Sequence, residues 1–416
     1  MSQPTTQPKR VLVAMSGGVD SSVTAALLAE EGYEVVGITM KTWDFATTGG
    51  KAEARAREAA ARAANKASGK EVGCCSLESM NDARSVALKR GFHHFVVDIR
   101  SEFGDWVIDR FTSDYLAGRT PNPCVLCNTH IKWAALLRRA DDLGCDFIAT
   151  GHYARVSQDA DTGRYVIQRG LDTNKDQSYA LWGLPQAHLA RSIFPLGHYT
   201  KPQIRQMASD FGLTEVANKP DSYEICFIPD NDYRGFLKRR VHGLADDVAG
   251  GSFVLEATGE VVGTHEGFPF YTVGQRRGLN LALGEPVYVT RIDAATNTVF
   301  VGPREALAGR TLTARQLNFV KVPNFHSGRE GERRAWGKIR YKDAGAPCLV
   351  RQTGDDTLEV VFEGPRDAIT PGQSLVLYDV NSDGTPSDDV LAGGWIDTVG
   401  DAAQTNADFL ALPVVG

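Results

Sequence analysis

The sequence predicts an α/β fold: a parallel-sheet domain, then a small central domain and a C-terminal β-barrel. Three observations support this. Short apolar runs alternate with helical patterns in the first half, which is typical of a parallel sheet covered by helices. A loop rich in Gly and Ser joins the first run to the first helix, where such folds bind ligands. From about Thr311 onward only strand patterns and turns follow. We place the domains at residues 1–217, 218–305 and 306–416.

The elements of the first domain follow from apolar spacing and from their end signals. A strand predicted at Val11–Met15 leads to a helix at Ser22–Glu30, which Gly32 ends. The same reasoning predicts, in chain order, a strand at Glu34–Met40, a helix at Asn81–Arg90, a strand at His94–Ile99, a helix at Ile131–Asp142 and a strand at Asp146–Thr150. Carboxyl ends of parallel strands share one edge, so the loops after the three strands that end at Met15, Met40 and Thr150 should meet there.

Composition restricts the class of protein. A chain of 416 residues, 42% hydrophobic and 23% charged, has room for two or three globular domains. No apolar run reaches the length of a membrane span and no signal-peptide pattern is present, so a cytoplasmic protein is expected. The net charge of −6 does not favour a nucleic-acid binder, although a mean charge hides local patches. An Ala-, Arg- and Lys-rich insertion at 49–73 is interpreted as a solvated helix or loop, with a basic RNA-binding arm as the alternative.

The loop Ser16-Gly17-Gly18 predicts a phosphate site. Glycines let the backbone approach an anion, and the following helix supplies N–H groups and its dipole. The lysine of a G-x-x-x-x-G-K-S/T loop is missing, and serines crowd the glycines instead. Such a loop suits pyrophosphate held while the α-phosphate of ATP is attacked, with Asp20 as a ligand of Mg²⁺. The alternative is a strand–turn–helix whose glycines only permit tight packing.

Cysteine chemistry is predicted at two further stretches. AGRTPNPCVLCNTHIKW contains Cys124 and Cys127, and KPDSYEICFIPD contains Cys226. A thiolate is a strong nucleophile and can carry a second sulfur as a persulfide. The alternatives are a metal half-site or redox pair for C-x-x-C, and a buried strand cysteine for Cys226. Of the other four cysteines, two adjacent ones are poorly placed for one metal ion and two in apolar runs are predicted core residues; these are Cys74 and Cys75, and Cys145 and Cys348.

Several motifs together make the chain resemble the tRNA 2-thiouridylase family. S-G-G-V-D-S-S matches the PP-loop signature of ATP pyrophosphatases, which implies an adenine nucleotide alpha hydrolase-like fold. The other shared motifs are G-R-T-P-N-P-x-x-x-C-N, A-T-G-H-Y, the run Gly170–Tyr179, I-C-F-I, G-Q-R-x-G-L, K-I-R-Y at Lys338–Tyr341 and T-P-G-Q at Thr370–Gln373. They occur in family order and reach all three domains.

The resemblance implies an enzyme that uses ATP to adenylate the C2 oxygen of the wobble uridine of tRNA. Sulfur from a cysteine persulfide then gives 2-thiouridine, AMP and pyrophosphate. It implies Cys127 as the nucleophile and Cys226 as the persulfide carrier, with a disulfide between them afterwards. The implied ATP-binding residues are Ala14, Met15, Ser16, Gly17, Gly18, Val19, Asp20, Ser21, Met40 and Gly151. The implied target-base residues are Asn122, Pro123 and Cys124, and the implied tRNA contacts are Lys175, Asp176, Gln177, Arg340 and Tyr341.

One departure from the family pattern keeps alternatives open. Cys124 stands where Asp is expected, so Cys124, Cys127 and Cys226 could instead hold a 4Fe–4S cluster for the same thiolation. A ligase of the same superfamily acting on a small molecule and a non-enzymatic RNA-binding module are more distant alternatives. The implied partners are tRNA, with the lysine, glutamate and glutamine tRNAs expected, and a sulfur donor, either a relay protein or a cysteine desulfurase.

Overall fold

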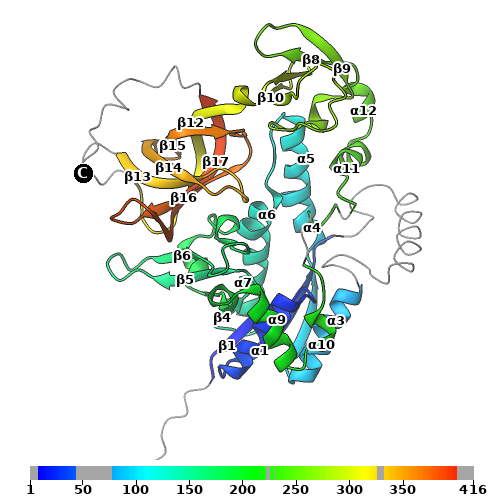
Figure 1. Ribbon diagram of the computed structural model, residues 1–416. Helices are drawn as coiled ribbons and strands as arrows, with labels where there is room; N and C mark the ends of the chain where they lie inside the picture. Colours follow the sequence, from blue (N-terminus) through cyan, green and yellow to red (C-terminus); the bar gives the residue numbers. More distant parts are fainter. Residues whose placement is uncertain (1–7, 44–76, 222–224, 229, 326–331, 401–416) are drawn as a thin grey trace, which may run out of the picture. The chain divides into compact units, whose positions relative to one another are not determined.

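The computed structural model describes residues 8–43, 77–221, 225–228, 230–325 and 332–400 (Figure 1). The 49–73 insertion, Cys74 and Cys75 lie outside this part of the chain. Two compact units are present: Met1–Asp109 with Pro123–Arg240, and Arg110–Asn122 with Val241–Gly416. None of the helices in the described ranges is long and apolar enough to cross a membrane.

A parallel five-stranded sheet forms the centre of the first unit. Its order is β3 (His93–Asp98), β2 (Glu34–Lys41), β1 (Arg10–Ala14), β4 (Phe147–Ala149) and β7 (Ser192–Ile193). All four neighbouring pairs are parallel, which confirms the α/β prediction. The ends of the four predicted strands differ from the observed ends by at most one residue. The two-residue β7 was not predicted, because so short a segment shows no periodicity.

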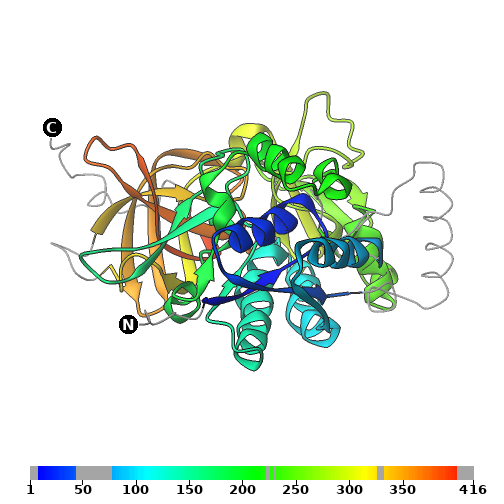
Figure 2. The ribbon, with the colours of Figure 1, turned by 90° about the horizontal axis from the view of Figure 1, so that it is seen from below.

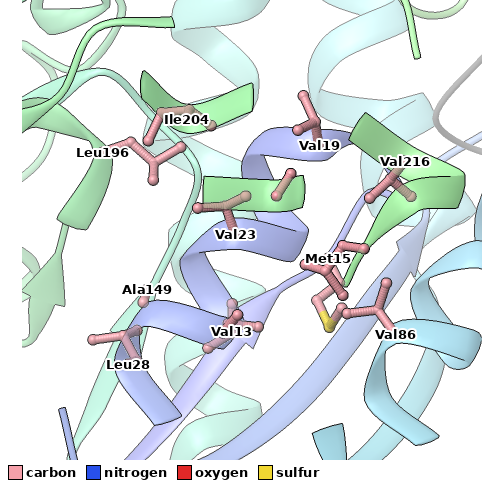
Figure 3. Packing of buried hydrophobic residues seen from close by; sticks show 14 of the residues in the cluster. Val13, Met15, Val19, Val23, Leu28, Val86, Ala149, Leu196, Ile204 and Val216 are labelled. Atoms are coloured by element: carbon pink, nitrogen blue, oxygen red, sulfur yellow. The ribbon is translucent and has the colours of Figure 1, made fainter. Parts of the chain in front are cut away.

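Helices cover both sides of this strand layer (Figure 2). One hydrophobic core combines β1 with helices α1 (Val19–Glu30), α3 (Leu77–Arg90), α9 (Lys201–Asp210) and α10 (Thr214–Ala217). Figure 3 shows Val13 of β1 and Val23 of α1 in this core, both fully buried. Leu12 alternates with Val13 and faces the other side, where α7 (Trp133–Asp142) contacts β1 and β4. Because helices pack on both faces of the sheet, the loops that follow the carboxyl ends of its strands are held at one edge.

All three predicted helices begin earlier than expected. The helix predicted at Asn81–Arg90 starts at Leu77. The first helix starts at Val19 rather than Ser22, because Gly18 is its N-cap. The helix predicted at Ile131–Asp142 is the end of a longer helical path that begins at Pro123. It consists of α6 (Pro123–Leu126), the π-helical turn η2 (Cys127–Lys132) and then α7. Proline suits a first helical position because it lacks the N–H that would find no partner there.

The remaining elements of the first unit are shorter. They are α4 (Arg100–Phe103), η1 (Gly104–Ile108), the antiparallel hairpin β5 (Ala154–Gln158) and β6 (Tyr165–Arg169), η3 (Ser178–Ala180), α8 (Gln186–Leu189), η4 (Pro195–His198) and α11 (Tyr233–Arg240). Helix α5 (Asp109–Leu116) crosses the boundary between the two units.

The second unit contains a small sheet and a closed barrel. The sheet order is β10 (Tyr288–Asp293), β11 (Thr298–Gly302), β8 (Gly251–Leu255) and β9 (Val261–His265), with short helices α12 (Leu244–Asp247), η5 (Phe268–Phe270) and η6 (Arg304–Leu307). The barrel order is β12 (Ala308–Phe319), β15 (Thr357–Asp367), β14 (Ala346–Gly354), β13 (Glu332–Lys338), β16 (Ser374–Val380) and β17 (Pro386–Gly400). Strand β17 pairs back onto β12, and every pairing is antiparallel. The predicted C-terminal barrel is confirmed.

Candidate functional site

The phosphate loop lies between β1 and α1 and is shaped by close backbone approach. Gly17 has φ +73°, and a Cβ there would lie 2.0 Å from the carbonyl oxygen of Ser79 in α3. The backbone N–H of Ser16 donates to the Ser21 hydroxyl at 3.1 Å, and this hydroxyl also contacts Gly18 O at 3.3 Å. No side chain caps the N-terminus of α1. A helix N-terminus without a side-chain cap at a glycine loop fits a phosphate group.

Gly151 and two lysines from distant parts of the sequence border this loop. A Cβ at Gly151 would meet the backbone between Asp20 and Ser21 at 3.0 Å, so the loop after β4 closes against the start of α1. Lys219 donates to the carbonyl oxygen of Gly17 at 3.3 Å. The ammonium of Lys201 lies at Asp20. Positive charge therefore borders a loop that has no lysine of its own.

The carboxylate of Asp20 is held by two side chains. Lys201 Nζ donates to both oxygens at 2.8 Å, and the Tyr153 hydroxyl donates to Oδ1 at 2.7 Å. Burial and the Asp20 charge raise the pKa of Tyr153 far above its ordinary value, so its hydroxyl keeps the proton it donates. Within the described ranges, no three His, Cys, Asp or Glu side chains are grouped to hold a metal ion. The magnesium role predicted for Asp20 stays a prediction, and no step below passes through a metal.

The cysteine pair lies on the helical path that starts at Pro123. Cys124 and Cys127 are three positions apart, so they share one helix face. Cys127 is buried and opens the π-helical turn, a distortion that often marks functional sites. Cys124 is exposed, yet the protein around its sulfur raises the pKa of the Cys124 thiol, with Lys132 acting in the opposite direction.

Cys226 is exposed, and its neighbour in the sequence packs into the first unit. Phe227 is buried and packs edge-on against Phe103 of α4, with ring centroids 5.8 Å apart. Helix α4 also contacts η2, the turn that Cys127 opens. As predicted for core positions, Cys145 and Cys348 are buried.

His152 is a site residue that the sequence reasoning missed. Burial and the charge of Lys132 lower the pKa of His152 to about 3, so the imidazole is neutral at pH 7. Its Nδ1 lies 2.7 Å from the Thr150 hydroxyl, and its ring packs against Trp133. His152 belongs to the motif A-T-G-H-Y, in which the sequence analysis assigned a role to Gly151 alone. Tyr153 of the same motif and Lys201 were also missed.

The residues before the cysteine pair are tied to the barrel of the second unit. Thr120 N–H donates to Pro371 O at 2.9 Å, and Gln373 Nε2 donates to Thr120 O at 3.2 Å. Arg119 donates to Asp397 at 3.2 Å. The T-P-G-Q turn thus holds the chain directly before Asn122, the first predicted target-base residue. Asn122 ends this segment, and Pro123 and Cys124 begin α6 in the other unit.

The predicted tRNA contacts fall into two groups. In the first unit, the Asp176 carboxylate accepts from Gly170 N–H and Ser178 N–H at 3.1 and 3.0 Å, and Gln177 Oε1 accepts from Tyr153 N–H. Lys175 pairs with Asp221. In the second unit, Arg340 and Tyr341 are exposed. Arg340 borders a pocket of about 430 Å³ that Thr120, Gln373 and Arg304 also line.

The fold and the loop define a class: nucleotide-binding α/β proteins of the PP-loop type that carry a second, barrel-containing unit. Family models match three segments, a tRNA methyl transferase HUP domain at 9–230, a tRNA methyl transferase PRC-barrel domain at 235–303 and an aminomethyltransferase beta-barrel domain at 309–396. Three relatives match almost the whole chain, and each is named tRNA-specific 2-thiouridylase MnmA. They come from Salinibacter ruber (65% identity, 97% of this chain and 98% of the relative), Amoebophilus asiaticus (56%, 93% and 95%) and Cytophaga hutchinsonii (54%, 93% and 97%). The chain belongs to the tRNA-specific 2-thiouridylase family.

The descriptions of the first two family models name a methyl transferase, whereas the relatives are named thiouridylases. We follow the relatives, because they match nearly full length at high identity. The resemblance to the tRNA 2-thiouridylase family is confirmed.

Proposed function

We propose that this protein is a sulfurtransferase that forms 2-thiouridine in tRNA at the expense of ATP. Its membership in the 2-thiouridylase family supports the expected enzyme class and the use of ATP. The observation that supports the proposal most directly is that the first unit contains both the phosphate loop and the cysteines. The glycine loop begins α1, while Cys127 and the neighbour of Cys226 both lie on segments that contact α4.

ATP activation would occur at the phosphate loop. The glycine backbone, the N-terminus of α1 and the ammonium groups of Lys201 and Lys219 are suited to hold pyrophosphate while the α-phosphate is attacked. The C2 oxygen of uracil is a poor leaving group as hydroxide. Attack of this oxygen on the α-phosphate releases pyrophosphate and makes the oxygen part of AMP, which leaves readily.

Sulfur transfer would then use the two thiols in the roles expected from the family. Cys226 carries the outer sulfur of a persulfide on its exposed side chain. The Cys127 thiolate attacks the Cys226 sulfur, forms a Cys127–Cys226 disulfide and releases hydrosulfide. The hydrosulfide attacks C2 and expels AMP, so one C–O bond is exchanged for one C–S bond. An external thiol reductant reduces the disulfide, and a relay protein or cysteine desulfurase then transfers a new sulfur to Cys226 as a persulfide.

The substrate we propose is the wobble uridine in the anticodon loop of the lysine, glutamate and glutamine tRNAs, in the cytoplasm. The base must leave its stack, which costs a few kcal/mol. Asn122, Pro123 and Cys124 are the proposed base contacts, and Thr120, two positions before Asn122, is hydrogen-bonded to the barrel of its own unit. Exposed Arg340 and Tyr341, with Lys175, Asp176 and Gln177, are the proposed contacts to the rest of the RNA.

A reconstituted assay tests the proposal. Full-length protein, ATP, magnesium, a cysteine desulfurase with sulfur-labelled cysteine, a thiol reductant and unmodified tRNA are incubated, and the tRNA is digested for nucleoside analysis. Labelled 2-thiouridine should appear only with ATP, and AMP should be released with it. Cys145→Ala is the matched control, because Cys145 is a buried cysteine that the proposal gives no role. Label that enters tRNA equally without ATP would refute the proposal, and iron that copurifies with activity under anaerobic conditions would favour the cluster alternative.

A further inference from the structure

His152 lies in the loop after β4, where this loop meets the phosphate loop. A Cβ on its neighbour Gly151 would lie 3.0 Å from the backbone at the start of α1. The charge of Lys132 lowers the pKa of His152 and opposes the raised pKa of the Cys124 thiol, so one ammonium group is near both side chains. His152 therefore lies between the nucleotide part and the base part of the proposed site.

Two aromatic side chains hold the imidazole ring. Trp133 packs against it with ring centroids 5.7 Å apart, and the Phe194 ring meets it edge-on at 6.3 Å. Trp133 is itself fully buried, and its Nε1 donates to the Ser192 hydroxyl at 2.7 Å. A ring packed against fixed aromatic neighbours has little freedom to turn, because interiors are close-packed. Packing therefore sets the directions in which the two ring nitrogens of His152 point.

The hydrogen bond to Thr150 decides which ring nitrogen carries the proton. The Thr150 hydroxyl lies 2.7 Å from Nδ1, and within the described residues it is the one hydrogen-bond partner of this ring. Because the pKa of His152 is about 3, the ring is neutral at pH 7 and has a single N–H. Thr150 is buried, and in the described ranges its hydroxyl has no acceptor other than Nδ1. The hydroxyl therefore donates to Nδ1, since a buried donor left unpaired is costly, and the ring proton is on Nε2.

The protonated Nε2 is a hydrogen-bond donor that still needs an acceptor. In the proposed reaction, the α-phosphate of ATP and the uracil C2 oxygen meet between the phosphate loop and the cysteine helix. Negative charge on the phosphoryl oxygens is redistributed when the C2 oxygen attacks. A donor whose direction is already fixed stabilises such charge without having to reorganise. A neutral imidazole suits this task, because it donates a hydrogen bond and keeps its proton.

We propose that His152 is a catalytic residue whose Nε2–H donates a hydrogen bond to an oxygen of the α-phosphoryl group while the uracil C2 oxygen is adenylated. In this step a bond forms between the C2 oxygen and the α-phosphorus, and the bond from that phosphorus to pyrophosphate breaks. Pyrophosphate leaves with the electron pair, and the N3 proton of the uracil passes to water. The imidazole stays neutral, and Thr150 keeps the ring proton on Nε2. The inference rests on the proposed ATP-dependent function.

ATP–pyrophosphate exchange by the full-length protein, with unmodified tRNA and without a sulfur donor, tests this role. His152→Ala removes the donor and should lower the kcat of exchange by about 100-fold, a typical loss for one such hydrogen bond. Its KM for ATP should stay close to the wild-type value, because the lost bond acts mainly in the transition state. His152→Gln places an amide N–H near the position of Nε2 and should restore part of the rate. His152→Asn reaches only the position of Nδ1 and should not.

His188→Ala is the matched control. His188 is half-buried in α8 of the same unit, and burial lowers its pKa as well. The proposal gives it no role, so its loss should leave the kcat of exchange at the wild-type value. If His152→Ala does not fold, the comparison of the glutamine and asparagine variants decides, because both keep a planar polar group at position 152.

Nitrogen-15 NMR of the full-length protein with labelled histidine adds a readout that a purely structural role would not predict. The signals that His152→Gln removes should come from a protonated Nε2 and an unprotonated Nδ1. A protonated Nδ1 would refute the inference. Exchange at the wild-type rate in His152→Ala, or equal rates in the glutamine and asparagine variants, would also refute it. Absence of exchange in the wild type would instead overturn the proposed function, whatever the NMR result.

Discussion

Replacing Gly17 by alanine tests the shape of the phosphate loop. Gly17 has φ +73°, and the Cβ of an alanine there would lie 2.0, 2.6 and 2.8 Å from the backbone O, C and Cα of Ser79. The left-handed conformation alone costs an alanine about 1–2 kcal/mol. The contact with Ser79 adds to this, because carbon atoms pack at roughly 3.5–4.0 Å and the loop or α3 must move by more than about 1 Å. A displacement of this size at a reacting group can lower a rate by about 100-fold.

Gly32→Ala is the control that separates backbone strain from close approach. Gly32 has φ +87° in the turn after α1, and a Cβ there would meet nothing within 4 Å. Both variants should lose about 1–2 kcal/mol of unfolding free energy from the backbone conformation, measured by urea denaturation. Only Gly17→Ala should lose ATP–pyrophosphate exchange in the presence of tRNA, by about 100-fold. Equal loss of exchange in the two variants would refute the reasoning.

The thiols, the barrel contact of Arg119 and the carboxylate of Asp221 can each be tested by substitution. Cys127→Ser and Cys226→Ser should each stop thiolation, and after loading by a desulfurase mass spectrometry should find the extra sulfur on Cys226 in the Cys127 variant; sulfur on Cys127 in the Cys226 variant would reverse the roles. Cys124→Ala should cost about 1–3 kcal/mol of transition-state binding for one lost contact, read from kcat/KM, and Cys124→Asp should keep substantial activity; a parallel loss of iron would identify a cluster ligand instead. Arg119→Ala breaks the tie to Asp397, so it should lower thiolation while calorimetry finds ATP binding unchanged; weaker ATP binding would contradict this. The pKa of Asp221 is about 2 in the folded protein and near 4 in the unfolded chain, so its contribution to the free energy of unfolding is complete above about pH 4 and is lost as the pH falls toward 2. Asp221→Asn should therefore reduce the loss of unfolding free energy between about pH 4 and pH 2. An unchanged loss in this pH range would contradict the ion-pair assignment.

Local patterns predicted much of the architecture. The alternation of apolar runs and helical stretches predicted the strands that became β1, β2, β3 and β4, and the strand-only texture predicted the barrel. The ends of elements were predicted less well. The helix expected at Ile131 in fact starts eight residues earlier at Pro123, since a π-helical turn disturbs the helical period between them. Period-based reasoning fails where the geometry departs from 3.6 residues per turn.

The sequence by itself determined the chemistry that contiguous residues encode. The phosphate loop is a run of neighbours between a strand and a helix, and the C-x-x-C spacing places two thiols on one helix face, so both can be recognised without a fold. Only the tertiary structure decided what surrounds them. Tyr153 and Lys201 reach Asp20 from 133 and 181 positions away. An ion pair or hydrogen bond between such distant residues leaves no periodicity in the sequence, because packing of the sheet and its helices, rather than any local preference, brings the partners together.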